Sequence, residues 1–386
     1  MSATAFVYGP HLQAHNPSAD TERRMRRELG IALLEAYGLL EHTDVVRHDP
    51  RPATDAELLA VHAPEYVDAV RRIDARPELA TQPDERRWGF ADGDTVPHAG
   101  MHEAAMAACG SAVTGALEIW EGRALRAFCP APAGLHHALR DRATGMCIYN
   151  DAAVAIQVLL DRGAQRVAYI DVDAHHGNGV QWIFYEDPRV LTCSVHESGR
   201  YLYPGTGHLG ERGVGAAEGT SVNVPLPPFA GDASYLGAVD HVIGPAVRRF
   251  APEVVVMMTG VDPHHADPMA HLQVTTAAFP ELYARLRGIA DDAAGGRWLT
   301  VTGGGYNIDL LPRLWALQLA CMLDVELPEA LPAAWLAMAA QRAGREFTSR
   351  LLGDEPIQVD EGSRANADAQ AFETIEAART LFGLVG

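Results

Sequence analysis

Four short runs of strand character in this chain each end in residues that can bind a metal or move a proton. The runs are Leu125–Cys129, Val167–Ile170, Val254–Met258 and Trp298–Thr302. They lack a regular alternation of polar and apolar residues, which is typical of parallel strands buried on both faces. Ligands of open α/β sheets bind beyond the carboxyl ends of the strands. We therefore expect an α/β fold with a polar site where these four strands end.

The chain reads as one domain with a C-terminal extension. Strand-like runs alternate with Ala- and Leu-rich helical stretches from Phe6 to about Met322, without an internal repeat or a linker. A single α/β sheet can organise a chain of 386 residues, so the length does not require two domains. We assign residues 1–323 to the domain that carries the site. Residues 324–386 form an extension that packs on this domain or continues it.

The charge balance excludes several kinds of partner. Thirty-one Lys and Arg against fifty Asp and Glu give a formal net charge of −19, which repels phosphate backbones and anionic membranes. We expect neither nucleic acid nor a membrane as a partner.

The first residues show no basic segment followed by an apolar core, which predicts a cytoplasmic protein. Five cysteines without a CxxC pair indicate reduced thiols: Cys109, Cys129, Cys147, Cys193 and Cys321.

A candidate metal site follows two of the strands. In an extended chain, alternation places Asp171, Asp173 and His175 on one side. Asp262 comes from another strand end and completes an Asp/His/Asp set with one position left open, the pattern of catalytic zinc. Oxygen-rich ligation leaves iron(II), cobalt(II) or manganese(II) open as alternatives. A single Asp at a strand end often only caps a turn, but four motifs together favour a shared site.

Proton-transfer groups are available at the other two strand ends. His136 and His137 follow a strand within a Pro- and Gly-rich loop, and amide cleavage needs a base and an acid. Asp171 and Asn178 are candidates to orient the two rings through their second nitrogens. Tyr306 follows three glycines, and its hydroxyl can donate to an oxyanion. These residue types point to hydrolysis of an amide.

Together the motifs resemble the histone deacetylase superfamily, most closely its bacterial acetoin-utilization-type branch. The similarity extends from about Phe6 to Leu323 and is densest over Ala131–Asn150, Tyr169–Asn223 and Val254–Tyr306, which include DVDAHHGNGVQ, SVHESGRYLYPGTG, GVD and TGGGY. It implies an arginase/deacetylase fold, with a central parallel sheet of about eight strands flanked by helices. It also implies zinc-dependent hydrolysis of acetyl-lysine amides by metal-activated water, so residues 1–323 would be a catalytic domain.

The resemblance assigns roles residue by residue. It implies zinc ligands, catalytic residues, two monovalent-cation sites of the kind that bind potassium, and substrate contacts. The zinc ligands would be Asp173, His175 and Asp262, and the catalytic residues His136, His137 and Tyr306, with Asp171 and Asn178 as partners of the histidines. The first cation site would use Asp171, Asp173, His175, Ser194 and Val195, and the second the backbone oxygens of Phe184, Asp187, Val190 and Thr220. Substrate contacts would be Asp94, at the rim, Gly145, Met146, Tyr203, Met269 and Gly304.

The sequence departs from the family pattern at the histidine pair and at the acyl-lysine tunnel. Asn178 stands where some members have an aspartate, so we expect His137 to be less basic than in an Asp-paired site. Met146 replaces the phenylalanine usual on one tunnel wall, and a flexible thioether there softens the tunnel. Tyr203 occupies the position of the other aromatic wall. These differences bear on substrate range and leave the reaction unchanged.

Several residues near the site leave alternatives open. Arg26 matches either an arginine that lines the product channel or a solvated helix face. His264 and His265, just after Asp262, are predicted as exposed loop histidines, with contact to the site as the second interpretation. Met269 aligns with an apolar gatekeeper, where a carboxylate would indicate a cationic polyamine substrate.

The implied substrate is an acetylated protein or peptide, and family analogy suggests a metabolic enzyme such as an acyl-CoA synthetase. The alternative is an acetylpolyamine or another small acylated amine. An arginase-like site with two manganese ions is disfavoured because Pro263 and His264, and not a second acid, follow Asp262. An inactive acyl-lysine-binding module is disfavoured because every ligand and the tyrosine are present. The sequence does not predict the oligomeric state.

Overall fold

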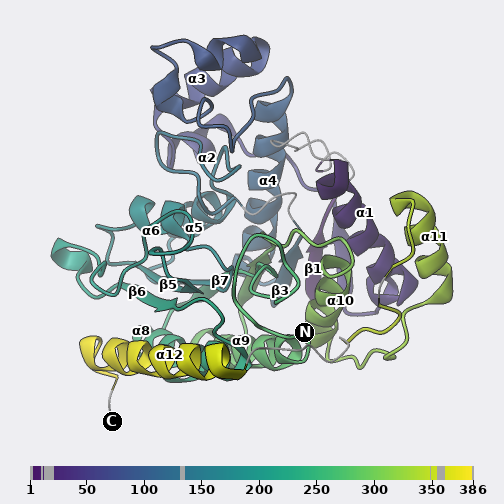
Figure 1. The fold of residues 1–386 in the computed structure, drawn as a ribbon. Helices are drawn as coiled ribbons and strands as arrows, with labels where there is room; N and C mark the ends of the chain where they lie inside the picture. The colour runs from purple at the N-terminus through teal and green to yellow at the C-terminus, as the bar shows by residue number, and fades with distance from the viewer. Residues whose placement is uncertain are drawn as a thin grey trace.

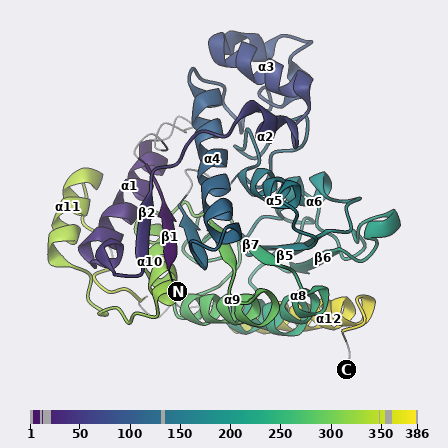
Figure 2. The same ribbon diagram turned by 180° about the vertical axis from the view of Figure 1, so that it is seen from behind.

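The computed structural model describes residues 3–9, 12, 21–130, 135–347, 349–353 and 361–384. These residues form one parallel sheet with the strand order β2-β1-β3-β8-β7-β4-β5-β6 and helices on both faces (Figures 1 and 2), which confirms the predicted α/β arginase/deacetylase architecture. The strands are β1 Thr4–Val7, β2 Val45–His48, β3 Arg126–Cys129, β4 Val167–Asp171, β5 Val190–Glu197, β6 Ser221–Leu226, β7 Val254–Met258 and β8 Trp298–Val301.

Helices cover both faces of the sheet, so its inner strands are buried on each side. The α-helices are α1 Thr21–Ala36, α2 Asp55–Leu59, α3 Pro64–Ala75, α4 Met101–Trp120, α5 Asp151–Asp161, α6 Asn178–Ile183, α7 Asp232–Ala238, α8 Gly244–Phe250, α9 Ala278–Ala294, α10 Leu311–Leu323, α11 Ala333–Ala343 and α12 Glu361–Leu381. A π-helical turn, η6 Val239–Ile243, joins α7 to α8, and the 3-10 turns are η2 Leu39–Glu41, η3 Pro77–Thr81, η4 Arg86–Trp88 and η5 Gly215–Ala217.

Two hydrophobic cores lie on opposite faces of the sheet. In β3, Phe128 belongs to the core shared with α1, α9 and α10, whereas Ala127 and Cys129 belong to the core shared with α4 and α5. Successive side chains of a strand point to opposite faces, so both sets must be apolar when both faces are covered. This double burial explains why the strand runs show no polar alternation.

The four strands that end in site motifs lie side by side as β3-β8-β7-β4 at the centre of the sheet. Their ends are level, because Cys129 pairs with Val301, Val301 with Met258, and Met258 with Asp171. Parallel strands in register deliver the residues after their carboxyl ends to one edge of the sheet. The sheet therefore gathers the four motifs on that edge.

The described part of the C-terminal extension packs on the same body. Helix α12 lies along the lower border in Figure 1, with Ala371, Ile375 and Ala378 in the core that includes β5 and β6. The hydroxyl of Ser234 on α7 donates to Asp368 at 2.5 Å. Residues 354–360 of the extension lie outside the described residues. Within the described ranges, no helix has both the length and the apolar character needed to cross a membrane.

Candidate metal centre and catalytic site

Asp173, His175 and Asp262 come together as a buried cluster beyond β4 and β7, with one potential ligand atom from each within 4.8 Å of the others. The Nδ1 atom of His175 lies 3.1 Å from Asp173 Oδ1 and 3.0 Å from Asp262 Oδ2. Burial, and then the neighbouring Asp173 carboxylate, raise the pKa of Asp262 to about 7. A divalent cation would stabilise both carboxylates in their ionised form. The donor set therefore fits a metal.

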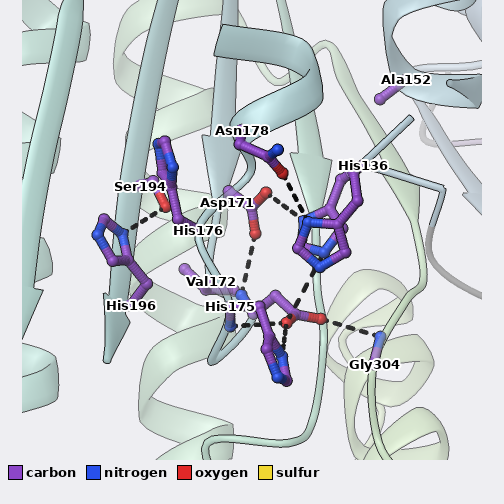
Figure 3. A network of polar contacts seen from close by, with 12 residues as sticks. His136, Ala152, Asp171, Val172, His175, His176, Asn178, Ser194, His196 and Gly304 are labelled. Carbon is purple, nitrogen blue, oxygen red and sulfur yellow. Dashed lines mark hydrogen bonds and ion pairs between the residues drawn. The ribbon is translucent and has the colours of Figure 1, made fainter. Parts of the chain in front are cut away.

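Backbone amides hold the ligand carboxylates in place. Asp173 Oδ1 accepts from His175 N at 2.9 Å, and Asp173 Oδ2 accepts from Gly304 N at 2.9 Å (Figure 3). A Cβ atom at Gly304 would lie 2.2 Å from Asp262 Oδ2 and 2.4 Å from Asp173 Oδ2, so only glycine fits there. The glycine-rich turn after β8 thus brings a backbone donor against the candidate ligands, and Gly304 packs against the Asp/His/Asp cluster.

The tandem histidines lie next to this cluster with their rings 4.0 Å apart. His136 Nδ1 is 2.8 Å from Asp171 Oδ2 (Figure 3), and His137 Nδ1 is 2.7 Å from Asn178 Oδ1. His136 Nε2 lies 3.9 Å from Asp173 Oδ1. Each ring is therefore oriented by a different acceptor, one charged and one neutral.

The two partners give the histidines opposite electrostatic character. Burial lowers the pKa of His136, but the Asp171 and Asp173 carboxylates outweigh it and raise that pKa to about 9. Burial, followed by the neighbouring His136, holds the pKa of His137 well below its usual value. Because the Asn178 oxygen accepts a hydrogen bond from Nδ1–H of His137, the lone pair of the neutral ring is on Nε2.

Tyr306 is held from two sides. Its backbone N–H donates to Asp267 Oδ2 at 2.5 Å, and the Arg26 guanidinium carbon lies 4.6 Å from the centre of its ring. Asp267 and Arg26 are both buried. The interpretation of Arg26 as a solvated helix face is therefore wrong, because its side chain packs against the tyrosine.

The sequence analysis missed the residues that hold the histidine loop. Asn150 Nδ2 donates to His136 O at 3.3 Å and to Ala138 O at 3.0 Å. His62 Nδ1 bonds Leu139 O at 3.0 Å, while its Nε2 accepts from Asn150 N at 3.0 Å. Asn150 could have been noticed as the residue before a helix, since its side chain also caps α5. Nothing in the sequence marks His62.

Gly145, Met146 and Tyr203 lie around the His137 ring or in the turn beside it. A Cβ atom at Gly145 would lie 2.4 Å from His137 Cδ2. The Tyr203 ring packs edge-on against His137 with 5.0 Å between centroids. Met146 follows Gly145 with a positive φ of 63°, and its side chain is half-buried.

Asp94, predicted as a rim residue, is half-buried and bonds the backbone of this turn. Asp94 Oδ2 accepts from Gly145 N at 2.9 Å, and Thr95 Oγ1 accepts from Met146 N at 3.0 Å. Thr95 in turn donates to Asp94 Oδ1 at 3.1 Å. Met269 is 40% exposed, and its N–H donates to Asp267, which also holds Tyr306.

The predicted cation-site residues fall into two places. Asp171 and Ser194 are paired across β4 and β5 at the ligand end of the sheet, and Val195 follows in β5. Phe184 O accepts from Asp187 N and Asp187 O from Val190 N within the turn before β5. Thr220 O accepts from Thr192 N at 2.8 Å, which places it beside the start of β5.

One prediction about the loop after Asp262 is wrong. His264 is 1% exposed, and its Nε2 lies 3.0 Å from Thr276 Oγ1. Its ring also packs near Phe279. His264 is thus a buried imidazole with a hydrogen-bond partner, and His265 is half-buried beside it.

A parallel eight-stranded sheet with a candidate metal triad, paired histidines and a tyrosine beyond its central strands defines the arginase/deacetylase class of fold. The family profile of the histone deacetylase domain matches residues 20–322. The chain belongs to the histone deacetylase family, a family of hydrolytic deacetylases.

The most similar curated relatives include acetoin utilization proteins. AcuC of Bacillus subtilis (strain 168) is 38% identical over 338 residues, covering 87% of this chain and 86% of that protein. AcuC of Staphylococcus aureus (strain MSSA476) is 37% identical over 354 residues, covering 91% and 88%. The crystal structure of an HDAC homolog from Aquifex aeolicus has a TM-score of 0.83 at 26% identity and covers 98% of this chain and 100% of that chain. The resemblance read from the motifs is confirmed.

Proposed function

We propose that this protein is a zinc-dependent amidohydrolase that removes acetyl groups from lysine side chains of proteins. The observation that carries the proposal is the placement of two differently paired histidines beside a buried Asp/His/Asp cluster. Asp173, His175 and Asp262 would hold the zinc, although the same donors suit iron(II) or cobalt(II). When bound, the metal supplies Lewis-acid polarisation of the acyl carbonyl and makes water more acidic.

His137 is the group suited to take the proton from the attacking water. Its Nδ1 is engaged by Asn178 Oδ1 at 2.7 Å, so Nε2 carries the lone pair. Its low basicity favours the neutral ring before attack and the return of the proton from Nε2 to the leaving amine. We assign the base and acid roles to this one nitrogen.

His136 acts electrostatically. Its Nδ1 is 2.8 Å from the buried carboxylate of Asp171, a pairing that stabilises a protonated ring. Asp171 also accepts from the Tyr169 hydroxyl at 2.5 Å and is therefore fixed in position. A fixed cation beside His137 stabilises the negative charge that develops on the acyl oxygen.

Tyr306 completes the site as an oxyanion donor. Its hydroxyl would donate to the acyl oxygen as that oxygen becomes negative. Asp267 accepts from the backbone N–H of Tyr306, and the Arg26 guanidinium lies over its ring. A donor that is already oriented needs no rearrangement when the charge forms, which is how such groups lower a barrier.

The residues around His137 support a lysine side chain as substrate. The Tyr203 ring packs against His137, and Met146 follows Gly145 in the turn beside that ring; an aromatic ring and a thioether are surfaces suited to a chain of methylene groups. Asp94 at the rim would bind the peptide backbone, and the apolar Met269 argues against polycationic amines. We propose an acetylated protein or peptide as the partner, with an acyl-CoA synthetase as one candidate, in the cytoplasm.

Potassium is proposed as the second cofactor. The first site would combine Asp171, Asp173, His175, Ser194 and Val195 at the carboxyl ends of β4 and β5. The second would use the carbonyl oxygens of Phe184, Asp187, Val190 and Thr220 at the start of β5. Backbone and carboxylate oxygens are hard ligands of the type that alkali cations take, and an ion at the first site would stiffen the metal loop.

The decisive experiment compares an acetyl-lysine peptide with an acetylpolyamine as substrates of the zinc-loaded protein, with Asp262→Asn as control. Turnover of the peptide that vanishes in the control supports the proposal. Preference for the polyamine would transfer the assignment to small acylated amines. Turnover of neither substrate would reject both.

A further inference from the structure

We propose that residues 333–347 and 349–353, beyond the part of the chain that matches the family profile, brace the Tyr306 loop, and that Arg345 is a positioning residue for Tyr306. The proposal rests on the function proposed above for Tyr306. The loop needs support because it begins with three glycines, one of which, Gly305, has a φ of 127°. Glycine leaves the backbone free to move unless neighbouring groups hold it.

The direct contact is a two-point ion pair with Asp309, three residues after Tyr306. Arg345 Nη2 lies 2.8 Å from Asp309 Oδ1, and Nη1 lies 3.1 Å from Asp309 Oδ2. The Asp309 side chain is only 8% exposed, whereas that of Arg345 is 44% exposed. A bidentate pair fixes the orientation as well as the position of a carboxylate.

Hydrogen bonds connect Asp309 to the loop after Asp262 through Asn307. Its N–H donates to Asn307 Oδ1 at 2.9 Å, and Asn307 Nδ2 donates to Ala266 O at 2.9 Å. The next residue, Asp267, accepts from Tyr306 N. The segment that carries the tyrosine is thus held between the loop after Asp262 and the C-terminal segment.

Arg313 fastens the end of the brace to the first turn of α10. Its Nε donates to Asp309 O at 2.8 Å, and its Nη1 donates to Leu352 O at 3.2 Å and Gly353 O at 2.8 Å. Arg313 is 5% exposed and Leu352 6% exposed. Arg345 therefore bonds the Asp309 side chain directly, and Arg313 links the Asp309 carbonyl to the end of the C-terminal segment at Leu352 and Gly353.

The segment is itself anchored, which a brace requires. Trp335 on α11 packs edge-on against Phe347 at 5.4 Å, and both rings are buried in the core. Trp335 Nε1 donates to Leu29 O of α1 at 3.0 Å. Buried aromatic rings give the segment a fixed base from which Arg345 extends.

A second path reaches Tyr306 through α1. Helix α11 lies beside α1 in both views (Figures 1 and 2), and Arg342 pairs with Glu28 at 3.3 Å. Less than one turn earlier on α1, Arg26 lies over the Tyr306 ring. The C-terminal segment therefore supports both the backbone after Tyr306 and the cation that covers its ring.

The test is Arg345→Ala, with Arg345→Lys as the conservative variant and Arg350→Ala as the matched control. Arg350 belongs to the same segment, but its ion pair with Glu346 is exposed on both sides. We expect Arg345→Ala to lower kcat about 5- to 30-fold with KM within about 2-fold, since a displaced donor weakens transition-state contacts more than binding. Lysine should recover part of the loss, and the control should match the wild type.

Two further readouts separate positioning from general stability. In a Tyr306→Phe background, Arg345→Ala should change kcat by less than about 2-fold, because the hydroxyl that it positions is gone. Amide hydrogen exchange at residues 306–311 should accelerate at least about 5-fold in Arg345→Ala and remain unchanged in Arg350→Ala. Wild-type kcat, an equal loss in the phenylalanine background, or unchanged exchange would each overturn the proposal. If the wild type hydrolyses no acylated amine, the function proposed above fails, and exchange alone decides on the brace.

Discussion

Asn150→Ala tests whether the histidine loop depends on a single amide side chain. The side chain is fully buried; its Oδ1 accepts from Ala153 N at 3.0 Å, and its Nδ2 donates to His136 O and Ala138 O. Losing a helix N-cap costs about 1 kcal/mol, and a buried carbonyl that loses its donor costs about 1–3 kcal/mol. His136 O keeps a donor in the variant, because Gly179 N donates to it at 2.9 Å. Only the Ala138 carbonyl is therefore counted as losing its hydrogen-bond donor. The expected loss of unfolding free energy is about 2–4 kcal/mol.

Urea unfolding measures this loss, and steady-state kinetics measures its consequence for the site. We expect kcat to fall about 10-fold with little change in KM, because the carbonyls next to the histidine rings lose their support. Asn150→Ser is the matched control, since it keeps a capping oxygen and removes the amide donors. It should recover about 1 kcal/mol of stability but not the activity. An alanine variant within about 0.5 kcal/mol of the wild type, or with unchanged kcat, would refute this reasoning.

Three other perturbations address the tyrosine, the metal ligands and a buried histidine. Tyr306→Phe should lower kcat about 10²–10³-fold on an acetyl-lysine peptide, and near-normal turnover would remove the hydroxyl from the mechanism. Asp262→Asn should lower the zinc content measured by elemental analysis after dialysis, and full occupancy would show that this carboxylate is not a ligand. Burial lowers the pKa of His62 from 6.5 to about 4, so the unfolded chain binds the proton more tightly and stability is lost as the pH falls through this range. The unfolding free energy of the wild type should therefore drop more steeply there than that of His62→Gln, and parallel curves would contradict this.

Much of the fold and the site could be read from local sequence. Strand β7 begins and ends as predicted, and β3, β4 and β8 differ from the predicted bounds by one residue at one end. Burial on both faces leaves an apolar run in the sequence, and this signal needs no knowledge of neighbours. The residue types after these runs already pointed to a metal and to proton transfer.

Contacts between distant segments could not be read in this way. The sequence predicts exposure for His264, but Thr276 and Phe279 enclose it. The sequence also does not predict that the Asp94 carboxylate accepts hydrogen bonds from Gly145 N and from the Thr95 hydroxyl. The burial and the hydrogen bonds of these side chains depend on which loops pack together, and the local sequence pattern does not encode that packing.

The sequence by itself determined the parallel α/β class, the motif-bearing strand ends and the chemical identity of the candidate ligands. Only the tertiary structure decided that β3, β8, β7 and β4 are neighbours with level ends. It also decided that Asn150 and His62 bond the histidine loop and that Asp267 bonds the backbone of Tyr306. The physical reason is the range of the interactions. Periodicity reflects burial along one element, whereas hydrogen bonds such as those from His62 to the histidine loop join elements whose proximity is set by strand order and helix packing.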